Sequence, residues 1–424
     1  MKHKLRLLIL SALVLSTCQL YSQSFLRDSK DFVLPFDNID AKLLSNHIAK
    51  IADSARIIGL GEASHYTKEC YELKHHIIKK LIEKGYDALV LEVDFGQAVL
   101  WNDYVTNGKG NVDELVAQSG WFTYRTQEFK NILIDIRKHN LTADKPFQVF
   151  GMEMTAMNYN LDWLAEYFTK HFDSSNKIIA TLKEERTIVA FQQHEETEIK
   201  AYWDLYYAIK RTLTENEQLL VTNGGENNFE IANRITEITR QYATYISQDE
   251  FLLKVELRDQ FSTRNVLWSL NHLGEDSQIA IWAHNGHVAK KSVLFSYDIL
   301  GHYLSEWFGE AYYSIGFTFN EGEFGAFSSN GFKRWNLPSI TTASVTKELD
   351  SYQSPYLLFD IRENLKEDIG MDSPLRQEMP IRTDVSESFS DETNPMMRIN
   401  LPESYDCLIY IDKTNFPTTI DWKR

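Results

Sequence analysis

The sequence is short of positive charge and of cysteine, and both shortages narrow what the protein can be. Its 424 residues carry 44 Lys and Arg against 60 Asp and Glu, which gives a formal net charge of −16. Such a surface repels phosphate backbones and anionic membranes, so we expect no nucleic acid as a partner. Of the three cysteines, Cys18 lies near the N-terminus, and Cys70 and Cys407 form either one disulfide or two buried thiols.

Long apolar runs are also missing beyond the N-terminus. Residues 1–23 show a basic start, an apolar stretch and a polar exit, which is typical of a secretory signal peptide and too short for a membrane span. We therefore expect an exported protein, periplasmic or secreted, whose mature chain of residues 24–424 has no integral membrane segment. The mature form is either soluble, after cleavage near residues 22–24, or anchored by a lipid on Cys18.

Three common catalytic motifs are absent as well. The chain contains no G-x-S-x-G nucleophile elbow, no P-loop and no H-E-x-x-H segment, so a serine hydrolase of the common kind is not expected. GLGEAS at 59–64 resembles a dinucleotide-binding loop, but Ser64 replaces its third glycine. Glu62 would also place a carboxylate where the pyrophosphate should bind. We therefore expect no nucleotide cofactor.

What the sequence does contain is four short apolar runs that each lead into an acid or a histidine. A run that is apolar at every position is typical of a parallel strand covered on both faces. The runs are RIIGL at 56–60 before Glu62 and His65, DALVL at 87–91 before Glu92, FQVF at 147–150 before Glu153, and QIAIWA at 278–283 before His284 and His287. Because ligands bind outside the carboxyl ends of strands in open α/β sheets, we expect these side chains to meet in one crevice.

Helical periodicity separates the strands and dominates one long stretch. Residues 68–84 predict a helix between the first two strands, which makes a βαβ unit. From about 158 to 273 the strand pattern disappears, and apolar residues recur every three or four positions. Further strand candidates lie at 312–319, 356–361 and 407–411. The predicted fold class is α/β, with a largely parallel central sheet flanked by helices and a long helical insertion at about 158–273.

The histidines at the strand ends suit acid–base catalysis. With no obvious nucleophile in the chain, water is the natural attacking group, and histidine is the side chain that supplies a base near neutral pH. His65 follows Glu62 by three residues, so the carboxylate can fix its tautomer. His284 and His287 either donate hydrogen bonds to a developing oxyanion or bind a metal ion, and their spacing does not decide between these. Glu153 either joins the site or caps the following helix.

Other residues have a structural interpretation beside the functional one. Lys74 lies nine residues past His65 on the expected helix, so its reach into the crevice depends on its long side chain. Arg258 and Asp259 lie within an expected helix, where a surface ion pair is the default interpretation. Aromatic residues such as Trp121 are expected in the core, with some lining a hydrophobic substrate pocket.

Taken together, several segments resemble the erythromycin esterase family. They are GLGEASHYTKE at 59–69, LEVDFG at 91–96 and WAHNGHVA at 282–289, with weaker similarity at Trp121, at GMEM (151–154) and at Arg258-Asp259. The resemblance implies a metal-independent carboxylic ester hydrolase without a cofactor, which in some members opens a macrolactone ring. A small-molecule ester or lactone is then the expected substrate.

The resemblance also implies roles for individual residues. His65 is the expected general base for water, with Glu62 and Glu92 as its orienting acids. His284 and His287 are expected to steady the tetrahedral intermediate, and Lys74 stands where the family often has an arginine. Three residues are expected beside the substrate: Trp121, Glu153 at a frequent aspartate position, and Tyr66 at a usual glycine position, where its bulk would narrow the pocket.

Two alternatives stay open on the sequence. A metal-dependent hydrolase would use the same histidines and carboxylates. A non-catalytic periplasmic binder of a hydrophobic ligand would keep the crevice without needing His65.

Overall fold

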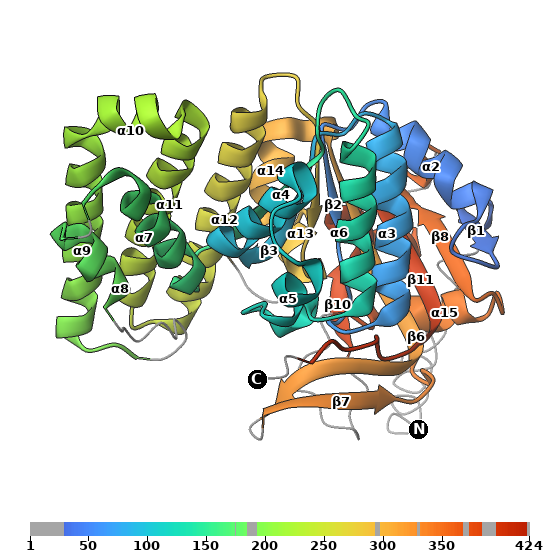
Figure 1. Ribbon diagram of the computed structural model, residues 1–424. Helices are drawn as coiled ribbons and strands as arrows, with labels where there is room; N and C mark the ends of the chain where they lie inside the picture. Colours follow the sequence, from blue (N-terminus) through green and yellow to red (C-terminus); the bar gives the residue numbers. More distant parts are fainter. Residues whose placement is uncertain are drawn as a thin grey trace, which may run out of the picture.

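A large mixed sheet forms the centre of the molecule. The computed structural model describes residues 29–173, 175–184, 193–292, 297–328, 331–367, 373–383 and 396–421. Its strands are β1 (Val33–Phe36), β2 (Ile57–Leu60), β3 (Ala88–Asp94), β4 (Gln148–Glu153), β5 (Ile279–Trp282), β6 (Tyr312–Ser328), β7 (Gly331–Leu337), β8 (Tyr356–Asp360), β9 (Glu378–Ile381), β10 (Met397–Asn400) and β11 (Cys407–Thr414). Within the described residues, nine of these form one sheet in the order β1-β8-β11-β6-β2-β5-β3-β4, with β7 paired to β6 and with β9 and β10 separate (Figure 1).

The middle of this sheet is parallel, as the sequence predicted. β11, β6, β2, β5, β3 and β4 follow one another in parallel pairing, while β1 and β8 run antiparallel at one edge. β2 and β5 are buried at every residue, which explains why their sequences are apolar throughout. β6 continues past the sheet into a hairpin with β7, which the sequence analysis did not predict.

Helices cover both faces of the sheet. On one face, α2 (Lys42–Ala52), α3 (Lys68–Glu83) and α6 (Gln127–Asn140) pack their apolar sides onto Leu60, Leu89 and Trp282. The other face is covered by the helical insertion and by α14 (Leu300–Phe308), which pack onto Ile57, Val90 and Ile281. The remaining helices beside the sheet include α4 (Phe95–Asn107), α5 (Val112–Ala117), η3 (Phe122–Tyr124), α13 (Asn285–Val288) and α15 (Val345–Asp350).

The predicted helical insertion is confirmed. It consists of α7 (Asn158–His171), α8 (Lys177–Lys183), α9 (Glu196–Glu215), α10 (Glu217–Gly224), α11 (Glu226–Ile246) and α12 (Phe251–Leu273). Figure 1 shows α7 to α11 as a lobe beside the sheet, with α12 running between the lobe and the strands. The side-chain amide of Asn265 on α12 donates to the carbonyl oxygen of Met152 on β4 at 2.7 Å, which ties this helix to the sheet.

Two expectations about the chain can be followed further. Cys70 and Cys407 are free, buried thiols, so the disulfide alternative is wrong. No helix in the described part of the chain is both long and apolar enough to cross a membrane. The expected signal peptide and Cys18 lie outside the described residues.

Candidate active site

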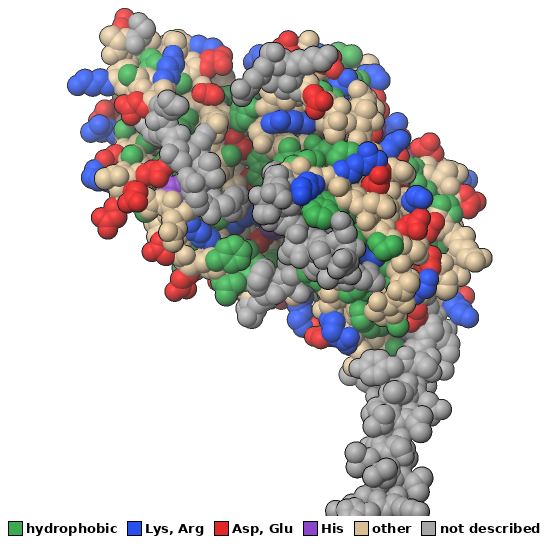
Figure 2. Space-filling model, turned by 90° about the horizontal axis from the view of Figure 1, so that it is seen from below, with side chains coloured by type: hydrophobic (Ala, Val, Ile, Leu, Met, Phe, Trp, Pro, Cys, Tyr) green, Lys and Arg blue, Asp and Glu red, His purple; other side chains and the backbone are tan. Residues whose placement is uncertain are grey.

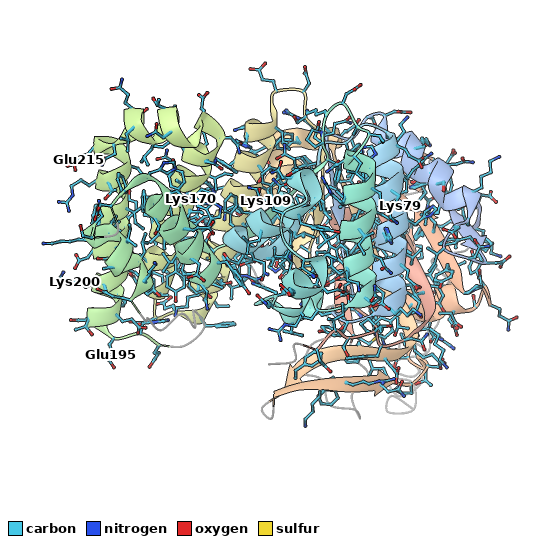
Figure 3. All side chains as sticks on the ribbon, viewed as in Figure 1. Lys79, Lys109, Lys170, Glu195, Lys200 and Glu215 are labelled. Carbon is cyan, nitrogen blue, oxygen red and sulfur yellow. The ribbon has the colours of Figure 1, made fainter. Side chains whose placement is uncertain are left out.

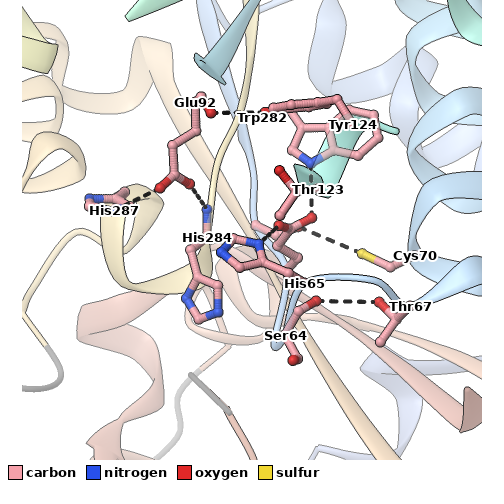
Figure 4. A network of polar contacts seen from close by, with 12 residues as sticks. Ser64, His65, Thr67, Cys70, Glu92, Thr123, Tyr124, Trp282, His284 and His287 are labelled. Carbon is pink, nitrogen blue, oxygen red and sulfur yellow. Dashed lines mark hydrogen bonds and ion pairs between the residues drawn. The ribbon is translucent and has the colours of Figure 1, made fainter. Parts of the chain in front are cut away.

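The acids and histidines at or just beyond the carboxyl ends of β2, β3, β4 and β5 converge at one edge of the sheet. Figure 4 shows His65, Glu92, His284 and His287, from three segments of the chain, in one network of polar contacts. They meet because their strands are neighbours in parallel pairing, so equivalent ends lie side by side.

The loop after β2 forms the first half of the site. His65 Nδ1 lies 2.5 Å from Glu62 Oε1, and Glu62 Oε2 accepts hydrogen bonds from Lys74 Nζ at 2.8 Å and from Trp282 Nε1 at 2.9 Å. Gly61 is required here, because a Cβ on this residue would lie 2.1 Å from Asn285 Oδ1. Three donors thus hold one carboxylate in a fixed orientation beside the imidazole.

Charge keeps Glu62 ionised in spite of its burial. Burial favours the neutral acid, but the Lys74 ammonium and the His65 hydrogen bond outweigh that effect and lower the pKa of Glu62 to about 2. Burial lowers the pKa of His65, yet the hydrogen bond and negative charge of Glu62, together with Glu92, raise it above its ordinary value. The Glu62 contact engages Nδ1, so Nε2 is the nitrogen available for proton transfer.

Glu92 organises the second half of the site. Its Oε2 accepts a hydrogen bond from the backbone N–H of His284 at 2.9 Å, and its Oε1 lies 2.7 Å from Arg258 Nη2 and 3.4 Å from His287 Nε2. The same Arg258 nitrogen lies 2.7 Å from Glu153 Oε1, which is fully buried at the end of β4. Burial favours the neutral acid of Glu92, but His287 and Arg258 hold its pKa well below the ordinary range.

His287 is held behind the site rather than at its open side. Its Nδ1 lies 2.7 Å from Asp259 Oδ1, and its Nε2 lies 3.1 Å from Arg258 Nη1. Burial opposes the charged form, but Asp259 and Glu92 raise the pKa of His287 to about 10. His287 is therefore an imidazolium near neutral pH and is fully engaged by charged neighbours.

His65 and His284 face each other at the accessible part of the network. Their ring centroids are 5.0 Å apart at an angle of 67°, an edge-on arrangement, and the His65 side chain is 31% exposed. Rings at this distance are in van der Waals contact, so a water or a substrate oxygen would bind beside the pair at its exposed side rather than between the rings. This edge of the molecule is seen in Figure 2, where a hollow separates the helical lobe from the sheet body.

The residues expected beside the substrate lie in different surroundings. Tyr66 is only 3% exposed, and its ring packs among Phe122, Phe332 and Phe416, with its hydroxyl donating to the Phe122 carbonyl oxygen. Its φ of 57° lies in the left-handed region, which explains why a glycine suits this position. Trp121 is half-buried directly before η3.

Glu153 is paired with Arg258 and has no exposed surface. Neither Tyr66 nor Glu153 therefore offers much surface to a substrate, and the ring of Tyr66 anchors its loop to the aromatic cluster.

Arg258 and Asp259 do not form the surface ion pair that was the default expectation from the sequence. Both lie on α12, and instead of a surface ion pair they link Glu92, Glu153 and His287 inside the site. Asp259 is 1% exposed. The signal that pointed to them is the weaker family similarity at Arg258-Asp259.

Trp282 and Asn285 have roles that were not predicted from the sequence. The indole N–H of Trp282 donates to Glu62. The side chain of Asn285 donates to the carbonyl oxygen of Phe317 at 2.7 Å and accepts from the backbone N–H of Phe317 at 3.1 Å. These contacts hold the segment between the two histidines in place.

The carboxylates of the site are arranged to form ion pairs with side-chain cations. The carboxylate oxygens of Glu62 and Glu92 are taken up by Lys74, by Arg258 and by N–H donors. Within the ranges that the structure describes, no group of three or more His, Cys, Asp or Glu side chains is placed to hold a metal ion.

Comparison with known proteins identifies the family and the fold. A family model described as erythromycin esterase matches residues 82–414. Erythromycin esterase type II from Escherichia coli is 23% identical over 314 residues, which cover 68% of this chain and 74% of that protein. The matched region of the family model begins after Glu62 and His65, so the placement of these two residues rests on the geometry.

Solved structures show the same fold. A Bacillus cereus protein of 25% identity superposes with a TM-score of 0.78, covering 94% of this chain and 100% of that one. A mutant of the erythromycin esterase EreC in its open conformation, 17% identical, superposes with a TM-score of 0.66 over 92% of this chain and 100% of that one. With the family model matching well over half of its length, the chain belongs to the erythromycin esterase family, whose members are hydrolases.

Proposed function

We propose that the protein is an exported hydrolase of carboxylic esters, lactones included, in which His65 activates a water molecule. The observation that carries the proposal is the contact of 2.5 Å between Glu62 and the Nδ1 of a partly exposed His65, directly opposite His284. A buried carboxylate on Nδ1 fixes the tautomer and stabilises the imidazolium that forms when Nε2 takes a proton.

The reaction follows from the positions of the two facing histidines. His65 Nε2 removes a proton from water while the oxygen attacks the carbonyl carbon. The His284 ring donates a hydrogen bond to the oxyanion that develops on the carbonyl oxygen. His65 then returns the proton to the leaving alkoxide, so the carbon–oxygen bond breaks without a covalent intermediate on the protein.

The other charged residues hold these two histidines. Lys74 and Trp282 orient Glu62, and Glu92 holds the backbone of His284. His287 and Arg258 neutralise Glu92 from behind, so we assign His287 to positioning rather than to oxyanion stabilisation. The engagement of both carboxylates by side-chain cations also favours this mechanism over the metal-dependent alternative.

Turnover of an ester panel that includes macrolactones, by the wild type and by His65→Ala, tests the proposal. We expect the substitution to lower kcat/KM by about 10²–10⁴, the usual contribution of a positioned base. His302→Ala is the matched control, because His302 is a partly exposed histidine on α14 that pairs with Asp298 outside the site. Unchanged turnover in His65→Ala would place the chemistry elsewhere. A wild type that binds the esters without cleaving them would favour the non-catalytic binder.

A further inference from the structure

Three large apolar side chains are exposed together at the start of α12. Phe251 is 66% exposed, Leu252 is 55% exposed and Leu253 is 37% exposed. Elsewhere in the described ranges, large exposed apolar side chains occur singly, as at Leu141 and Trp307. A single exposed apolar residue is ordinary, but a contiguous group indicates a surface with a function.

Helix geometry aligns two of the three with the active site. Phe251 and Leu252 precede Arg258 and Asp259 by seven residues each, and residues seven apart lie on the same face of a helix, two turns from one another. Arg258 and Asp259 point into the candidate site. Phe251 and Leu252 therefore face the same side, about 10 Å further along the helix axis at 1.5 Å per residue.

On the side of the helix between the patch and the site, Val255 stands in the middle with Lys254 and Glu256 on its flanks, whereas the third residue of the patch lies off this side. Half-buried Val255 follows Phe251 by four residues and Leu252 by three, so it bridges the two turns. Leu252 lies about 20° around the axis from Asp259, whereas Leu253 lies about 120° from Asp259 and about 140° from Arg258, so Leu253 faces away from the site. Leu252 and Leu253 thus have the same chemistry but lie on different sides of the helix.

The surroundings favour a neutral apolar ligand. Two acids, Asp249 and Glu250, directly precede the patch, and the chain carries a net charge of −16, so an anionic lipid or fatty acid would be repelled. Figure 2 shows hydrophobic side chains gathered where the lobe borders the hollow. On the opposite, outer side of the lobe, Figure 3 shows the charged side chains of Lys200 and Glu215 projecting away from the sheet.

We propose that Phe251 and Leu252 form a subsite for the neutral apolar portion of the substrate whose carbonyl group lies at His65. The inference rests on the proposed ester hydrolysis and adds a substrate class to it, that of esters with a long uncharged hydrocarbon part. Since the patch begins about 10 Å beyond Arg258 along the helix axis, we expect long hydrocarbon chains to reach it and short ones not to.

A chain-length series of p-nitrophenyl esters tests the subsite: acetate, butyrate, octanoate and dodecanoate. For the wild type we expect kcat/KM to rise between butyrate and dodecanoate, by about two- to four-fold per methylene that contacts the patch. Phe251→Ser and Leu252→Ser should each lower the dodecanoate value about tenfold and leave acetate unchanged. Leu253→Ser removes a similar apolar area from the far side of the helix and should leave the whole series unchanged.

Binding separates this inference from the proposed function. A neutral long-chain methyl ketone, which resembles the ester but is not cleaved, is titrated into each variant and followed by tryptophan fluorescence. If no ester is hydrolysed, but Phe251→Ser and Leu252→Ser weaken ketone binding and Leu253→Ser does not, the subsite stands and ester hydrolysis fails.

Two results would overturn the subsite itself. One is a chain-length series and a ketone affinity that are the same in all three variants and the wild type. The other is a change of oligomeric state in Phe251→Ser and Leu252→Ser on size-exclusion chromatography without any change in chain-length preference, which would make the patch a surface between copies of this chain.

Discussion

At the scale of single residues, the contact between Glu62 and His65 sets the pH range of activity. The base must be neutral to accept a proton, and Glu62 raises the pKa of His65. We therefore expect kcat/KM to increase with pH, with its half-maximal value above pH 6.5, the ordinary pKa of histidine. Glu62→Gln removes the negative charge, so the acid limb should move to lower pH while kcat falls, because the tautomer is held less firmly.

A pH profile of ester hydrolysis measures both effects. Glu72→Gln is the control, since Glu72 on α3 is partly exposed and pairs with Lys68 outside the site. An acid limb at the same pH in the wild type and in Glu62→Gln would show that His65 is not the titrating base.

The raised pKa of His287 leads to a prediction about how the free energy of unfolding depends on pH. Its pKa in the folded protein is about 10, above the value of about 6.5 in an unfolded chain. A raised folded-state pKa stabilises the fold fully below pH 6.5, and that contribution is lost as the pH rises through about 10. Its size is roughly 3–5 kcal/mol for a buried, paired group. Urea unfolding at pH 6.5 and at pH 9.5 should show a larger loss of stability with pH for the wild type than for His287→Gln. Equal losses would contradict the assigned charge of His287.

The sequence predicts which site residues converge when these residues stand at the carboxyl end of a strand. Glu62, Glu92 and His284 come directly after short apolar runs, and parallel pairing brings the ends of such strands together whatever the distance in sequence. The orientation of Tyr66 could not be predicted in this way. Its position depends on an aromatic cluster drawn from η3, β7 and the C-terminal segment, and contacts of such long range leave no local pattern.

At the scale of elements, α12 belongs to the insertion and also completes the active site. The periodicity of 251–273 predicted a helix but not which turn would face the strands, so Arg258 was assigned to the surface. In the structure its guanidinium pairs with Glu92 and Glu153 and lies against His287. The β6–β7 hairpin also escaped prediction, although it buries Phe324, Ala326 and Leu337, because Gly322 and Gly325 weaken the local strand pattern.

Arg258→Lys tests this role of α12. A lysine keeps the charge but cannot contact Glu92, Glu153 and His287 with a planar fork, so the two carboxylates should be held less firmly. We expect kcat to fall about 10–100-fold, with a smaller change in KM. Arg240→Lys on α11 is the matched control, because Arg240 makes a forked contact with Glu237 on the lobe. If Arg258→Lys and the wild type have the same kcat and KM, α12 only supports the structure and does not help to position the active-site carboxylates.

At the scale of the whole molecule, the N-terminal segment predicts export. Expression of the full chain in a bacterium with a periplasm should yield a mature protein that begins near residues 22–24, or a lipid-modified protein that begins at Cys18. Mass spectrometry of the purified protein distinguishes the two, and Cys18→Ser should remove only the lipid-modified form. Recovery of the uncleaved chain from the cytoplasm would contradict the prediction.

The charge balance of the whole site predicts the outcome of metal removal. Lys74, Arg258 and the His287 imidazolium supply the positive charge that a bound cation would otherwise bring to Glu62 and Glu92. A metal ion would have to displace one of these buried cations, and breaking a buried ion pair costs about 3–5 kcal/mol. We therefore expect ester turnover to be the same before and after dialysis against a chelator, and zinc or manganese to give no stimulation. Activity that is lost on chelation and restored by one of these metals would instead establish the metal-dependent mechanism, with His65 and His284 as candidate ligands.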